Sequence, residues 1–222
     1  MKLVKLLLSV IFVLSGCQAT FVEKSISKPE LPSLGHYKNK PNAYIQTKWI
    51  NGNPNKFIKS DPRADAALKN GVTKIVNEAH LFNYFTFDKD QVEQDALIFD
   101  RDKTDRAYQN KKPIDYTIEL IVYDNYDKVW TDWVPITQLF SLGLVPVYAT
   151  DEFIVTMKVY DNEGELIKSG KNSTATRTWV SWWVLPLGLT KYDTKDVITE
   201  LVTQQVIALF KECVDQNIFQ YK

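Results

Sequence analysis

The sequence predicts an α+β domain, an antiparallel sheet with an amphipathic helix after the first strand and a C-terminal helix packed on one face. Two segments, about residues 61–82 and 194–217, carry apolar residues at helical spacing. The segments between them alternate polar and apolar residues with the period of two that marks a half-buried strand. A content of 11 Tyr, 11 Phe and 6 Trp also favours strands over a helical bundle.

The first predicted strand covers residues 43–49, and the first helix is expected to begin at Asp61 and Pro62. Asp is a good N-cap, and Pro is tolerated at the first helical position because no hydrogen bond is lost there. The helix is expected to end near Phe82, because residues 84–87 are typical of a strand. Its predicted buried face consists of Leu68, Val72, Ile75, Val76 and Ala79.

Two central segments, residues 115–124 and 153–159, repeat apolar residues with a period of two and are predicted to be strands with one buried face each. A turn is expected at residues 161–164, because Gly164 can adopt a positive φ. The return strand should run from Glu165 to about Trp183, and the final helix from Thr194 to about Asn217.

The N-terminus carries the strongest biological signal. Lys2 and Lys5 precede a short apolar run that ends in Leu-Ser-Gly-Cys at residues 14–17. A transmembrane helix needs about 20 apolar residues, whereas a short apolar run between a charged start and small residues is typical of a signal peptide. The segment resembles the signal peptide of bacterial lipoproteins.

This resemblance implies that residues 1–16 are removed and that Cys17 carries the lipid, with palmitate among the expected acyl chains. Residues 17–42 are then interpreted as the lipidated N-terminus and a flexible tether, because they show no hydrophobic period, and residues 43–222 as a single domain. In Gram-negative lipoproteins a residue other than Asp after the cysteine favours the outer membrane. Gln18 therefore implies the periplasmic face of that membrane.

The other cysteine, Cys213, falls on the apolar stripe of the last helix. If Cys17 is acylated, Cys213 has no intramolecular partner, and a buried, inert thiol is expected. Loss of the signal peptide leaves 25 basic against 27 acidic residues, a balance that argues against a nucleic-acid partner.

No motif predicts a metal, cofactor or catalytic site. His36 and His80 do not stand at metal-ligand spacing, and no Gly-rich phosphate loop or nucleophile elbow is present. The acidic segment 88–105 lacks the glycine that an EF-hand needs at its sixth position. A hydrolase acting through paired carboxylates stays a less favoured alternative, because no such pair stands out.

Two uncharged stretches, residues 134–148 and 178–190, contain or adjoin five of the six tryptophans, and the hairpin at Gly164 should bring them to one end of the sheet. They fit buried core strands, a protein-docking patch or residues inserted at a bilayer interface. The candidate contact residues are Trp130, Trp133, Phe140, Leu142, Leu144, Trp179, Trp182, Trp183, Leu185 and Leu187.

The sequence therefore predicts a non-enzymatic, lipid-anchored envelope accessory protein that docks a membrane or a periplasmic partner through this Trp-rich end. The alternative is a protein that binds lipid or another hydrophobic ligand, with the same residues lining a pocket. The element order is also loosely similar to that of small accessory lipoproteins of envelope assembly and transport systems.

Overall fold

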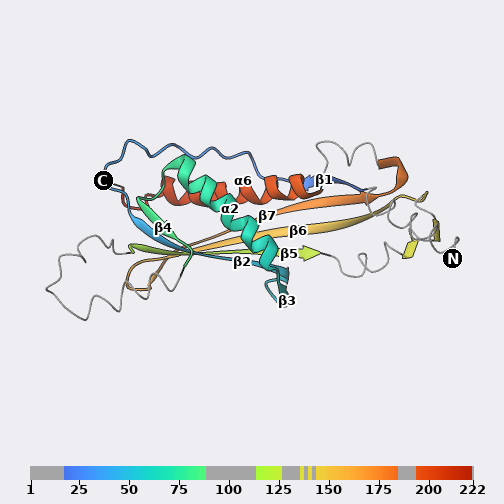
Figure 1. Cartoon of the computed structure of the whole chain (residues 1–222), viewed down its shortest axis with the longest axis horizontal. Coiled ribbons are helices and arrows are strands. Elements are labelled where there is room, and N and C mark those ends of the chain that lie inside the picture. Colours follow the sequence, from blue (N-terminus) through green and yellow to red (C-terminus); the bar gives the residue numbers. More distant parts are fainter. Residues whose placement is uncertain are drawn as a thin grey trace.

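The computed structural model describes residues 18–88, 114–126, 136–137, 140–141, 144–184 and 194–221. They form a mixed sheet of seven strands with two long helices on one face (Figure 1). The strand order is β1-β7-β6-β5-β2-β3, and β4 pairs with β2. The predicted α+β class is confirmed.

The elements occur in the following order: β1 (Gln18–Lys24), β2 (Asn42–Asn53), β3 (Lys56–Ser60), α2 (Pro62–Ala79), β4 (Tyr84–Thr86), β5 (Tyr116–Tyr126), β6 (Val147–Tyr160), β7 (Leu166–Val180), the short 3-10 helix η2 (Trp182–Val184) and α6 (Thr194–Asp215).

The sequence predicted an antiparallel sheet, but the observed sheet is mixed. Strand β2 pairs in parallel with both β4 and β5, whereas β5, β6, β7 and β1 form antiparallel neighbours. The physical reason is the crossover of α2, which carries the chain back over the sheet to the end where β2 began. The alternating pattern of one strand does not encode the direction of its neighbour.

The local predictions for α2 and the central hairpin are confirmed. Asp61 caps the helix, because its Oδ1 accepts the backbone N–H groups of Arg63 at 3.0 Å and Ala64 at 3.1 Å. The five residues predicted to form the buried face of α2 are its buried residues. Gly164 has a φ of 84° in the turn between β6 and β7.

Strand β1 occupies part of the segment that the sequence assigned to a flexible tether. Residues 18–24 pair with β7, from Gln18 opposite Val180 to Lys24 opposite Ala175. The Oγ1 of Thr20 is buried and hydrogen-bonds with Thr178 Oγ1 at 2.8 Å and with Thr194 Oγ1 at 2.7 Å. The strand lacks a hydrophobic period because its buried side chains are the small Ala19 and the polar Thr20.

The core lies between the sheet and the two helices. Strand β5 contributes Ile118, Leu120 and Val122, all fully buried, and α6 contributes Leu209 and Phe210. Cys213 of α6 is also fully buried, and burial raises the pKa of its thiol to about 12. The prediction of a buried thiol is confirmed, and the raised pKa keeps this thiol protonated at neutral pH.

Candidate functional site

Both uncharged stretches reach the same end of the sheet. Val147 at the start of β6 lies opposite Val180 at the end of β7, and Tyr148 lies opposite Trp179. Strand β1 begins at this end as well, because Gln18 also pairs with Val180. Figure 1 shows the short helix η2, which follows β7, at this same end of the sheet.

The tip of this end carries exposed apolar side chains. Phe140 is 85% exposed, Trp183 is 74% exposed and Leu144 is 60% exposed. Trp183 Nε1 donates a hydrogen bond to the carbonyl oxygen of Leu144 at 3.3 Å, which joins the two stretches. We define the apolar end as Ile136, Phe140, Leu144, Val145 and Trp183. The interpretation of these stretches as buried core does not hold for these five residues.

Trp179 differs from the residues at the tip. It is half-buried, and its ring packs against that of Tyr148 with centroids 5.0 Å apart. The guanidinium of Arg177 lies 4.7 Å from the centre of the Tyr148 ring and forms an ion pair with Glu23 of β1. Trp179 therefore contributes to packing on the sheet face opposite α6, because its neighbour Thr178 faces that helix.

Of the remaining predicted contact residues, Trp182 contributes its backbone to η2. The other predicted residues, which lie outside the described part of the chain, are Cys17, Trp130, Trp133, Leu142, Leu185 and Leu187.

Two carboxyl groups near this end were not predicted. Burial, with smaller contributions from the charges of Asp151 and Asp61, raises the pKa of Asp124 to about 7. Burial also raises the pKa of Asp151. Asp124 follows Leu120 and Val122 at strand spacing, so its helix-facing position could have been read from the alternation of β5.

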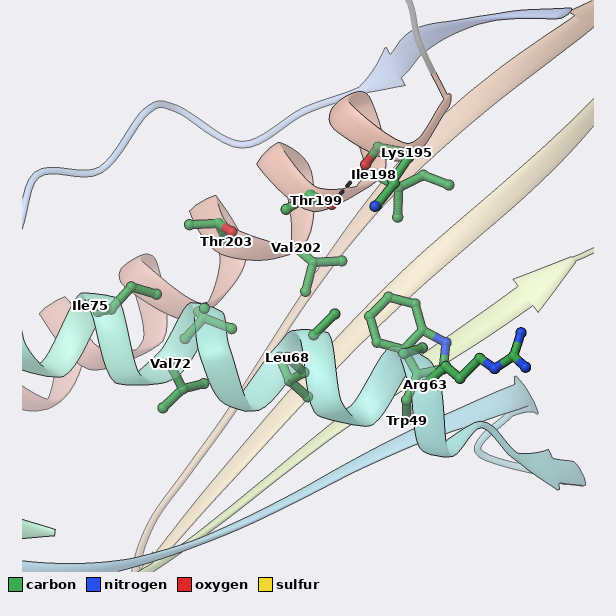
Figure 2. A pocket seen from close by; sticks show the side chains of 14 residues that line it. Trp49, Arg63, Leu68, Val72, Ile75, Lys195, Ile198, Thr199, Val202 and Thr203 are labelled. Carbon is green, nitrogen blue, oxygen red and sulfur yellow. Dashed lines mark hydrogen bonds between the residues drawn. The ribbon is translucent and has the colours of Figure 1, made fainter. Parts of the chain in front are cut away.

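A groove between α2 and α6, also missed at the sequence level, has a volume of about 440 Å³ (Figure 2). Its α2 wall includes the small residues Ala64, Ala67 and Gly71. Their spacing of three and four places them on one helix face and was the available signal.

Among the described residues, no group of three or more His, Cys, Asp or Glu side chains is placed to hold a metal ion. None of the helices in this part of the chain is long and apolar enough to cross a membrane.

Comparison with known proteins identifies no family: no family model and no curated protein sequence matches this chain. Among solved structures, two crystal forms of a PelC dodecamer from Paraburkholderia phytofirmans align at 12% identity with TM-scores of 0.35 and 0.36. They cover 86% and 85% of this chain and 99% and 96% of the PelC chains. A candidate lipoprotein from Caulobacter crescentus CB15 aligns at 10% identity with a TM-score of 0.34, over 78% of this chain and 91% of its own. Similarities at this level establish no shared function.

Proposed function

We propose that this protein is a non-enzymatic, lipid-anchored envelope protein whose apolar end rests on the bilayer that holds its lipid. The pairing of Gln18 with Val180 carries this proposal. Consecutive Cα atoms are about 3.8 Å apart. A lipid on the residue before Gln18 would therefore be attached next to a residue that is fixed to the apolar end of the sheet, so the lipid and the exposed apolar residues would share one end of the molecule.

Because β1 is paired in the sheet, the folded domain would be attached to the lipid almost directly and not through a flexible tether. A flexible coil over residues 18–42 would separate domain and membrane by roughly 27 Å and leave the domain free to turn. Because β1 is part of the sheet, the acyl chains instead bring Phe140, Leu144 and Trp183 toward the headgroups. Trp is favoured at that interface, and apolar side chains gain free energy by leaving water there.

The geometry favours this role over a ligand pocket built from the same residues. Phe140 and Trp183 are exposed over most of their surface and do not enclose a ligand between them. The signal peptide resemblance and Gln18 after the cysteine make the outer membrane, on its periplasmic face, the expected location.

Photo-crosslinking in cells tests the proposal. A photoreactive amino acid replaces Leu144 in the full-length, lipidated protein, and a matched variant carries it at Leu166. Leu166 is 54% exposed but starts β7 at the opposite end of the sheet. We expect adducts with phospholipid from position 144 and none from position 166.

Two results would overturn the membrane contact. Equal lipid adducts from both positions would show that the domain has no fixed orientation. A single protein adduct from position 144, without lipid, would make the apolar end a docking surface for an envelope protein instead.

A further inference from the structure

The groove between α2 and α6 is open at one end and lined mainly by apolar side chains. Figure 2 shows the two helices converging near Ile75 and diverging toward Arg63 and Lys195, with Trp49 of β2 on the floor between them. Leu68 and Val72 line the α2 side, and Ile198 and Val202 line the α6 side. The cavity is therefore a wedge with an apolar interior and a wide end that carries both cations.

The dimensions of the groove suit a single hydrocarbon chain. Its walls extend from Ala64 to Ile75 and from Lys195 to Val206, which is ~17 Å along each helix at 1.5 Å per residue. With bonds of about 1.5 Å and angles of about 111°, an extended chain advances ~1.25 Å per carbon, so ~13 carbons span the groove. The volume of about 440 Å³ falls in the range of small-ligand sites, roughly 300–1,000 Å³.

The positive charges at the wide end of the groove favour a ligand with an anionic head group. Arg63 and Lys195 line the wide end, and none of the described residues that line the groove is acidic. Lys195 Nζ points into the opening between the helices in Figure 2. An anionic head at this position would accept charge-assisted hydrogen bonds. Figure 2 shows the Arg63 side chain extending away from Lys195 and out of the groove, so Arg63 contributes positive charge at the wide end and Lys195 is the direct hydrogen-bond donor.

We propose that this groove binds one long-chain fatty acid, with its alkyl chain along Leu68, Val72 and Val202 and its carboxylate at Lys195 in the wide end, where Arg63 adds a second positive charge. This site is separate from the apolar end, and its occupancy does not depend on how that end meets the membrane. The exposed Ala67 and the half-buried Ile198 would be covered by the bound chain.

The test uses the full-length, lipidated protein in nanodiscs and myristate labelled with ¹³C at its carboxyl carbon. Myristate bound in the groove should give its own carboxyl resonance, which stays at the ionised position at a pH where bilayer-dissolved myristate is protonated. Ala67→Trp fills the groove and should abolish this resonance. Ala66→Trp places the same ring on the next exposed residue, outside the groove, and should leave the resonance unchanged.

The charge contribution is tested with the double variant Arg63→Gln/Lys195→Gln. Its affinity for myristate should fall at least ten-fold, while its affinity for the uncharged myristyl alcohol should stay the same. Circular dichroism and thermal unfolding establish that each variant is folded before binding is measured.

Three outcomes would overturn the proposal. The first is the absence of a bound resonance, or one that Ala67→Trp leaves intact. The second is a dimer of the wild type that only Ala67→Trp dissociates, which would assign the groove to a second copy of the chain. The third is binding by Cys17→Ser but not by the lipidated protein, which would assign the groove to the acyl chain of Cys17.

Discussion

The side-chain amide of Gln205 donates a hydrogen bond to Thr174 Oγ1 over 2.8 Å, between helix α6 and strand β7. Both residues are fully buried. The backbone of Gln205 takes part as well, because its carbonyl oxygen accepts from Asn172 Nδ2 at 3.4 Å. Helix α6 is therefore held on β7 by buried polar contacts as well as by apolar packing.

Thr174→Val should lower the free energy of unfolding by about 1–3 kcal/mol, because it leaves a buried amide N–H without its acceptor. Gln205→Leu removes the donor, so the double variant should be more stable than the sum of the two single effects predicts. Urea unfolding of all four proteins measures this coupling. Effects that add to within about 0.5 kcal/mol would show that the bond does not contribute as an interacting pair.

Gly170 allows α6 to approach β7 closely. A Cβ atom at Gly170 would lie 2.7 Å from Leu209 Cδ2, and Leu209 is almost completely buried. Gly170→Ala should therefore destabilise the fold by about 1–3 kcal/mol through overpacking. Gly71→Ala is the matched control, because its Cβ would meet nothing within 4 Å and the change should stabilise α2 by roughly 0.5–1 kcal/mol. Thermal unfolding that ranks the two variants in the opposite order would contradict this packing.

Asp124 should make the protein less stable as the pH rises. Its pKa is about 7 in the folded protein against 3.8 for the ordinary group, so the folded state keeps a proton that the unfolded state loses in that window. Stability is then highest below about pH 4 for this group and falls until about pH 7. The loss is a few kcal/mol at most, from about 1.4 kcal/mol per unit of pKa difference.

Asp124→Asn removes this titration. The variant should gain stability over the wild type progressively from pH 4 to pH 7, and the gain should stay constant above pH 7. Guanidinium unfolding at pH 4, 5.5 and 8 measures it. A difference that is the same at all three pH values would show that the pKa of Asp124 is not raised.

The apolar end should contribute to membrane contact without contributing to folding. Phe140→Ser/Trp183→Ser removes exposed side chains, so the free energy of unfolding should change by no more than about 0.5 kcal/mol per site. In the non-lipidated Cys17→Ser background, binding to phosphatidylethanolamine–phosphatidylglycerol vesicles should weaken at least ten-fold, because each buried large apolar side chain contributes about 1.5–3 kcal/mol. Leu166→Ser/Ile167→Ser, at the opposite end, should have no effect, and sedimentation with vesicles compares the two pairs.

The sequence by itself determined the features that depend on nearest neighbours along the chain. The Asp61 cap, the buried stripe of α2 and the turn at Gly164 follow from hydrogen bonds and backbone angles within a few residues. The same short-range physics predicted that the two uncharged stretches meet at one end, because a hairpin turn fixes the register of its strands.

The tertiary structure decided the features that depend on distant partners. Residues 18–24 carry no hydrophobic period, and they form a strand because the edge of β7 offers hydrogen bonds and Thr178 pairs with Thr20. The groove exists because α2 and α6, far apart in sequence, diverge over the floor made by Trp49. Periodicity reports which face of one element is apolar, but the free energy of edge pairing and of helix packing depends on the element that comes to lie beside it.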